Sequence, residues 1–152
     1  MQSGLLLAGG QRLTLSEIIA RFDLSANRLV TLSACETGIT DTEQAPDEFV
    51  GLQAGFLQAG APAVLSSLWA VNDRSTELLM SRFYQNLLGN SGRDSLAPAF
   101  ALREAQQWLR NTTAGTLGSN DETSASPAPE ADRPFSHPYH WAAFVVSGPH
   151  IG

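Results

Sequence analysis

Two short apolar stretches constrain the fold of this chain more than any other feature of its sequence. RLVTLS (residues 28–33) and AVLSSLW (residues 63–69) are too short for helices and are rich in strand-forming residues, so we expect both to be buried strands. Between them, DEFVGLQAGFLQAG (residues 47–60) has apolar residues at helical spacing. Strands that alternate with helices indicate an α/β fold, in which helices cover the faces of a sheet.

The expected helix over residues 47–60 has signals at its ends and along its length. Asp47 is expected to cap its start, and Gly60 is expected to end it before Pro62. Gly51 and Gly55 lie four residues apart, so we expect this helix to sit close to a sheet.

The N-terminal segment predicts a hairpin followed by a short helix. Residues 3–14 contain two strand-like runs joined by Gly9 and Gly10, which suit a tight turn. Thr14 and Glu17 have the spacing of a capping box, so a helix should start at Thr14.

The C-terminal half predicts two amphipathic helices and a last strand. The helices are expected over residues 72–88, where Asn72 or Asp73 can form the cap, and over residues 95–110. The strand is expected within residues 137–148. Between them, residues 111–134 have almost no large apolar side chain, which is typical of a disordered insert.

Length and composition limit the class of protein. A chain of 152 residues fits one domain, and no apolar run is long enough for a membrane helix or a signal peptide core. A single cysteine excludes an internal disulfide, so we expect a cytoplasmic protein in a reducing compartment. The formal net charge of −6 argues against nucleic-acid binding, and we expect no membrane partner.

The single cysteine, Cys35, follows the first buried strand, at the kind of position where α/β sheets collect reacting groups. As a nucleophile it would need a nearby base, because the thiolate is the reactive form. The three histidines are His137, His140 and His150, and no spacing argument brings any of them to the thiol. The alternative is that Cys35 is a small buried apolar residue, as most free cysteines are.

Five segments of the sequence together carry a family resemblance. In order, they are LVTLSACETG, GLQAGFLQAGAPAVLSSLWAVND, LLMSRFYQNLL, ALREAQQWLR and HPYHWAAFVVSG. They resemble the C-terminal half of a CHAT domain, a caspase-like family, distantly similar to separase, that is often found after tetratricopeptide repeats in bacteria. The resemblance runs from about residue 3 to residue 148 apart from the insert.

The resemblance implies a caspase-hemoglobinase fold, which is a three-layer α/β sandwich, and a cysteine endopeptidase with a His–Cys dyad. Cys35 in SACETG matches the nucleophile of the family. The family's base is a His followed by Gly, on a strand that would precede the SGLLLA segment at residues 3–8. We therefore expect a truncated domain, incomplete at its N-terminal side and inactive alone unless another segment or partner chain supplies the base and strands.

Asp73 and Glu77 are the candidate substrate-binding residues. Asp73 matches an acidic position common in the family, Glu77 follows one helical turn later, and either could attract a basic residue of a protein or peptide substrate. The alternative is that Asp73 caps the helix and Glu77 is solvated. We expect no cofactor and no metal, because the acidic segment DTEQAPDE (residues 41–48) lacks the ligand spacing of an EF-hand.

The sequence therefore leaves three hypotheses open. The first is the catalytic half of a CHAT-family cysteine peptidase with Cys35 as its nucleophile. The second is a non-catalytic interaction module, a degenerate domain whose exposed sheet edge binds a partner. The third is a self-sufficient cysteine hydrolase that uses His137 or His140 as its base.

Overall fold

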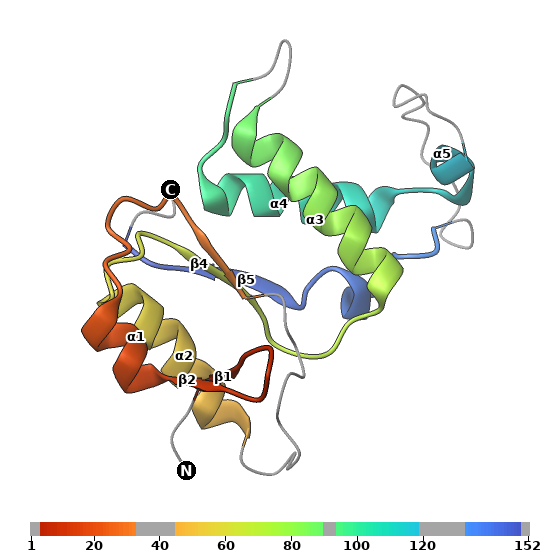
Figure 1. The fold of residues 1–152 in the computed structure, drawn as a ribbon. Coiled ribbons are helices and arrows are strands. Elements are labelled where there is room, and N and C mark those ends of the chain that lie inside the picture. The colour runs from red at the N-terminus through yellow and green to blue at the C-terminus, as the bar shows by residue number, and fades with distance from the viewer. Residues whose placement is uncertain (1–3, 33–44, 90–93, 119–132, 150–152) are drawn as a thin grey trace. The chain divides into compact units, whose positions relative to one another are not determined.

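The computed structural model describes residues 4–32, 45–89, 94–118 and 133–149 (Figure 1). Its contacts divide the chain into two compact units, each of which is described separately below. Unit 1 comprises residues 1–68 and 145–151, and unit 2 comprises residues 69–144. Unit 1 is therefore formed from two stretches of the chain, one that precedes unit 2 in the sequence and one that follows it.

Unit 1 begins with the expected hairpin and capped helix. Strands β1 (Gly4–Leu6) and β2 (Arg12–Thr14) pair antiparallel, and Gly9 and Gly10 between them have positive φ angles of 82° and 78°. Helix α1 (Leu15–Arg21) follows. The Thr14 hydroxyl accepts a hydrogen bond from the Glu17 N–H at 3.3 Å, and the Thr14 N–H donates to the Glu17 carboxylate at 2.9 Å. These reciprocal bonds confirm the predicted capping box.

The second sheet of the chain has the order β3-β4-β5. Strand β3 (Val30–Leu32) runs parallel to β4 (Val64–Ser67), with Val30 opposite Val64 and Leu32 opposite Ser66. Strand β5 (Phe144–Ser147) completes the sheet. The three predicted strands exist, and with the helices they make a mixed α/β structure.

Helix α2 (Ala45–Gln58) connects the parallel strands, and it differs from the prediction in two respects. It begins at Ala45, so Asp47 lies inside the helix and the predicted cap at Asp47 is wrong. A β-carbon added to Gly55 would overlap Leu15 of α1, so this glycine permits close packing against a helix and not against a sheet. Gly60 does end the helix region with a φ of 96°, as predicted.

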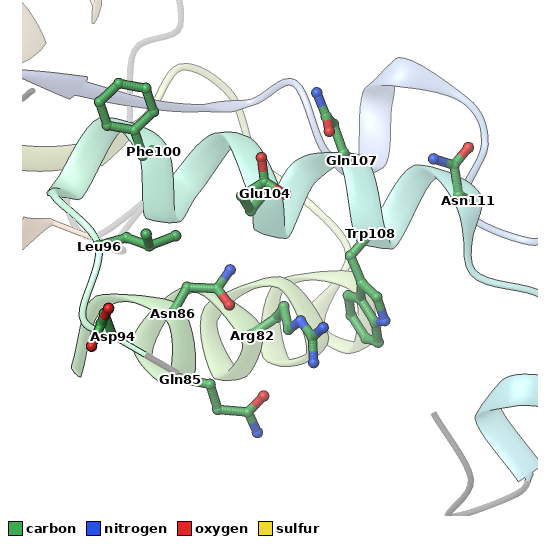
Figure 2. Close-up of a pocket in the computed structure, with 10 residues that line it drawn as sticks. All are labelled: Arg82, Gln85, Asn86, Asp94, Leu96, Phe100, Glu104, Gln107, Trp108 and Asn111. Carbon is green, nitrogen blue, oxygen red and sulfur yellow. The ribbon is translucent and has the colours of Figure 1, made fainter. Parts of the chain in front are cut away.

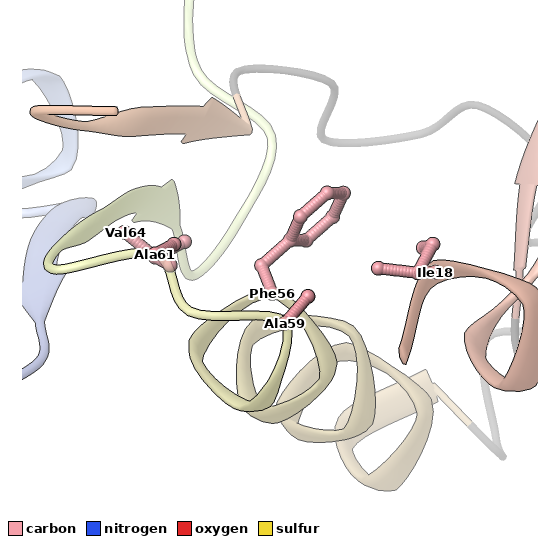
Figure 3. Packing of buried hydrophobic residues seen from close by; sticks show 5 residues of the cluster. All are labelled: Ile18, Phe56, Ala59, Ala61 and Val64. Atoms are coloured by element: carbon pink, nitrogen blue, oxygen red, sulfur yellow. The ribbon is translucent and has the colours of Figure 1, made fainter. Parts of the chain in front are cut away.

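The apolar core of unit 1 gathers around Phe56. Figure 3 shows Phe56 of α2 between Ile18 of α1 and the pair Ala61 and Val64 near the start of β4. All four side chains are at least nine-tenths buried. Burial of a side chain the size of Phe56 stabilises the fold by about 1.5–3 kcal/mol, so this contact fixes α1 and α2 against the strand region.

Unit 2 is built on the two predicted helices, α3 (Asp73–Leu88) and α4 (Pro98–Asn111). Asn72 caps α3, since its side-chain oxygen accepts hydrogen bonds from the N–H groups of Arg74 at 3.1 Å and Ser75 at 3.3 Å. The two helices contact each other, and each carries a buried apolar stripe. The buried residues of these stripes are Leu79, Phe83 and Leu87 on α3 and Ala101, Leu102, Ala105 and Leu109 on α4.

The expected insert at residues 111–134 is partly helical. Asn111 is the last residue of α4, and helix α5 (Ala114–Gly118) follows after two residues. The expectation that the whole stretch lacks structure is therefore wrong for its first eight residues, 111–118. Residues 119–132 lie outside the described part of the chain.

Candidate functional site

Cys35 itself lies outside the described residues, but the strand that precedes it in the sequence is described. Strand β3 ends at Leu32, three residues before Cys35, and Leu32 pairs in register with Ser66 of β4. The carboxyl ends of the two parallel strands therefore lie at the same edge of the sheet. Ser66 and Ser67, at the end of β4, are both buried.

A side-chain amide connects this edge of the sheet to α2. The Gln53 amide nitrogen donates to the Ser66 hydroxyl, and the Ser147 hydroxyl of β5 donates to the Gln53 amide oxygen at 3.4 Å. The nitrogen and the oxygen of the Gln53 amide thus bond to two neighbouring strands, β4 and β5. Since Ser66 is fully buried, its partner on Gln53 removes the free-energy cost of an unpaired buried hydroxyl.

Asp73 and Glu77 occupy the first two turns of α3. They are four residues apart, which places them on the same face of the helix, and both are exposed. The capping role belongs to Asn72, so the alternative in which Asp73 forms the side-chain cap is not what the structure shows. By its position in the sequence Cys35 falls in unit 1, whereas the acidic pair belongs to unit 2.

His137 and His140 lie in the segment that precedes β5, and each has local contacts. The Nδ1 atom of His137 accepts a hydrogen bond from the Tyr139 N–H at 3.2 Å, which caps the 3-10 helix Pro138–His140. The ring of His140 makes edge contacts with the rings of Phe135 and Tyr139, each at a centroid distance of 5.3 Å. His150 lies outside the described residues.

Trp69 lies in unit 2 immediately before α3. Its side chain is 38% exposed, and its indole N–H donates to the carbonyl oxygen of Tyr139 at 3.2 Å. The hydrogen bond fixes its orientation while leaving much of the ring open to solvent.

A groove between α3 and α4 was not anticipated from the sequence. Its volume is about 620 Å³, and its lining includes Arg82 of α3 and Glu104 and Trp108 of α4 (Figure 2). The missed signal was the row Phe100, Glu104, Trp108, whose spacing of four residues defines a second face of α4.

Within the described ranges, no three His, Cys, Asp or Glu side chains come together in a way that could hold a metal ion. Residues 41–44 of the acidic segment at residues 41–48 lie outside those ranges, and of residues 45–48 only the backbone at the start of α2 is described. None of the described helices is both long and apolar enough to cross a membrane.

Comparison with known proteins defines the class of this chain. The family model of the CHAT domain matches residues 1–149. The chain belongs to the CHAT family.

Two curated relatives are similar to most of the chain. Tetratricopeptide repeat protein 28 of Homo sapiens is 28% identical over 121 residues, which are 80% of this chain, and the Mus musculus protein of the same name matches to the same extent. The chain spans only 4% of the length of either relative. No solved structure matches the chain significantly.

Proposed function

We propose that the chain is the C-terminal half of a caspase-like cysteine endopeptidase domain, with Cys35 as the nucleophile. The fold would then belong to a three-layer caspase-hemoglobinase sandwich. Membership of the CHAT family supports the proposal, because SACETG at residues 33–38 matches the nucleophile motif of that family. The proposal concerns this domain and not the activity of the much longer relatives.

One observation carries the proposal: β3 and β4 are parallel and in register at Leu32 and Ser66. Reacting groups of open α/β sheets gather beyond the carboxyl ends of such strands. Cys35 follows the last residue of β3 by three positions in the sequence, and this spacing supports a place for the thiol near that end of the sheet. A buried apolar role for Cys35 would not require this position.

In the proposed reaction, a histidine base takes the proton of the Cys35 thiol, and the sulfur attacks the carbonyl carbon of a peptide bond. The histidine then gives the proton to the departing amine, and a water molecule hydrolyses the resulting thioester. General-base assistance of this kind contributes about 10² to 10⁴ in rate. Without it, Cys35 alone would be a poor catalyst.

The base is proposed to come from sequence outside this chain or from a partner chain. The surroundings of the two described histidines support this view, because His137 makes a local hydrogen bond and the buried Nδ1 of His140 has no hydrogen-bond partner among the described residues. His137 uses Nδ1 to cap a 3-10 helix, and His140 packs against Phe135 and Tyr139. These contacts favour packing roles over the third hypothesis, in which one of them activates Cys35.

Asp73 and Glu77 are proposed to bind a basic residue of the substrate. Both carboxylates are exposed on one face of α3, and Asn72 already supplies the cap, so neither is required for it. Opposite charges in solvent attract weakly, by about 0.2–1 kcal/mol per pair. The pair would therefore contribute to substrate preference more than to total affinity.

The edge position of β3 favours a second candidate, a non-catalytic module that binds a partner strand. In the described sheet order, β3 has β4 on one side, and Val30 and Leu32 are half-buried. Edge strands pair readily with strands from other chains. In this alternative the partner docks on β3 and Cys35 takes no part in chemistry.

The pH dependence of Cys35 alkylation by iodoacetamide separates these candidates. Because the chain has one cysteine, alkylation read by mass reports on Cys35 alone, and Cys35→Ser is the control. The rate is measured with and without an added domain that supplies the family's strand and its His-Gly. A thiol pKa that falls when the domain is added supports the peptidase. Binding of the domain without a change in the thiol pKa rejects the peptidase and favours the interaction module.

A further inference from the structure

The groove between α3 and α4 has the size of a ligand site. Its volume of about 620 Å³ lies within the range of about 300–1,000 Å³ that is usual for binding pockets. None of the residues that line the groove belongs to the buried stripes of α3 and α4. Figure 2 shows Arg82 of α3 and Trp108 of α4 extending toward each other, while Leu96 of the connecting segment lies toward the other end of the groove, on the side of Phe100.

Two hydrogen bonds and one cation–π contact hold the groove in shape. The Asn86 side-chain amide donates to the carbonyl oxygen of Ala101 at 3.2 Å, and the Leu96 N–H donates to the carbonyl oxygen of Asn86 at 2.9 Å. The guanidinium of Arg82 lies 5.4 Å from the centre of the Trp108 ring. A site that is formed before its ligand arrives loses less entropy on binding.

The charges of the groove favour a cationic ligand. Asp94 and Glu104 are exposed, whereas the Arg82 cation is half-buried over Trp108. Two open carboxylates against one engaged guanidinium oppose a phosphate or a nucleic acid, which need clustered positive charge. The groove also has too few apolar side chains to bury the face of an amphipathic helix.

The row Phe100, Glu104, Trp108 indicates what kind of cation would fit. Phe100 is 50% exposed, and Glu104 lies one helical turn from each aromatic residue on the same face of α4. Lysine and arginine combine an apolar stem with a terminal cation, so the stem can cover an aromatic ring while the cation reaches a carboxylate. A free metal ion would gain nothing from the rings.

The carboxamides of the groove suit a peptide backbone. Gln85, Gln107 and Asn111 are exposed, and each carries both a donor and an acceptor. Such groups can pair with the N–H and carbonyl groups of an extended chain whatever its sequence.

We propose that the α3–α4 groove binds an extended peptide segment through an arginine or lysine side chain whose cation pairs with Glu104. Asp94 adds negative charge, and Phe100 covers the stem of the bound side chain. This site is separate from the proposed substrate residues, because Asp73 and Glu77 lie in the first two turns of α3 and Arg82 and Asn86 in its last two. It does not depend on Cys35 or on peptidase activity.

The three tryptophans of the chain provide a test by ¹⁹F NMR of the full chain labelled with 5-fluorotryptophan. Trp108 reports on the groove, Trp69 on the start of α3, and Trp141 on the segment before β5, with assignments from Trp→Phe variants. The probes are two N-acetylated, C-amidated five-residue peptides, Ala-Ser-Arg-Ser-Ala and its counterpart with citrulline, a neutral isostere of arginine. We expect the arginine peptide to shift the Trp108 resonance with a Kd about 2- to 5-fold tighter than the citrulline peptide.

Glu104→Gln should remove this preference for arginine, whereas Asp23→Asn, which changes an exposed carboxylate outside the groove, should leave the Trp108 titration unchanged. Thermal unfolding of both variants checks that they remain folded. Equal binding of the two peptides at Trp108, or a saturable Trp108 shift with methyl glucoside, would overturn the proposal. A shift of Trp69 alone, lost in Glu77→Gln, would also overturn it, while supporting Asp73 and Glu77 as the substrate site.

Discussion

Gly148 and Ala63 lie in backbone contact at the end of β5: a β-carbon built on Gly148 would be 3.0 Å from the Cα of Ala63 and 2.5 Å from the carbonyl oxygen of Pro62. Gly148 also has a φ of 139°, which residues with side chains rarely adopt. The obstructing atoms belong to the backbone that leads into β4, so they cannot rotate away. The glycine therefore sets how closely the end of β5 approaches the start of β4.

Gly148→Ala should destabilise the protein by at least about 2 kcal/mol, because it combines a disfavoured φ with overlap on fixed backbone atoms. Urea unfolding measures the change. Gly115→Ala is the control, since the nearest atom to its added β-carbon is 3.8 Å away, and it should be neutral or slightly stabilising. Equal effects of the two substitutions would contradict the contact.

Gln53 should behave as one member of a coupled polar group. Gln53→Leu removes the partner of the buried Ser66 hydroxyl and is expected to cost about 1–3 kcal/mol. In Gln53→Leu/Ser66→Ala the unpaired hydroxyl is also gone, so the double variant should be more stable than the sum of the single changes predicts. If the free-energy changes of the two single variants simply add up in urea unfolding, the hydrogen bond between Gln53 and Ser66 does not contribute to stability.

The capping box at α1 predicts a pH dependence of stability. Hydrogen bonds from the Thr14 backbone and then from the Thr14 hydroxyl lower the pKa of Glu17, with a smaller effect of Arg21. A carboxyl whose pKa is lower in the folded state stabilises the fold above its unfolded pKa, and this contribution is lost as the pH falls through the folded pKa. Glu17→Gln should thus be less stable than the parent chain at neutral pH and approach it in acid, as compared by urea unfolding at pH 7 and pH 3. A difference that does not change with pH would argue against an ionised Glu17 in the box.

Asn72 and Asp73 should separate structural from recognition roles at the start of α3. Asn72→Ala removes the acceptor of two helix N–H groups and is expected to cost about 1 kcal/mol in thermal or urea unfolding. Asp73→Asn keeps the cap and should change stability by less than about 1 kcal/mol, through the helix dipole alone. If Asp73→Asn lowers the free energy of unfolding more than Asn72→Ala does, Asp73 stabilises the helix. That result would argue against its proposed role in substrate binding.

Among the substitutions considered in unit 2, truncation of Phe83 should reduce the stability most. Phe83 is a fully buried residue of α3, and Phe83→Ala is expected to cost about 3–5 kcal/mol. Leu88→Ala, on the same helix but 68% exposed, should cost little. Comparable losses of unfolding free energy at both positions would mean that the stripe of Leu79, Phe83 and Leu87 is not the packing face.

Local signals in the sequence were sufficient where structure depends on neighbouring residues. The capping box at Thr14 and Glu17, the turn at Gly9 and Gly10, and the helix end at Gly60 all follow from interactions within a few residues. These features need no knowledge of the rest of the fold, and the structure confirms each of them.

Features that depend on distant packing could not be predicted in this way. Gly55 was expected to approach a sheet, but its neighbour is Leu15 of α1, forty residues earlier. Helix α2 starts before Asp47, and α5 forms in a stretch whose composition favoured disorder. The groove at Arg82 and Trp108 needs two helices in a defined arrangement, which no single helical pattern specifies.

The division of unit 1 between two stretches of the chain has a consequence for synthesis. Residues 145–147, which supply most of β5, follow the whole of unit 2 in sequence. As a ribosome produces the chain from its N-terminus, α3 and α4 are available to fold before β5 has emerged, whereas the three-stranded sheet of unit 1 is not. Until then β4 has an open side next to Ser66, and any factor that acts on the growing chain meets that incomplete sheet.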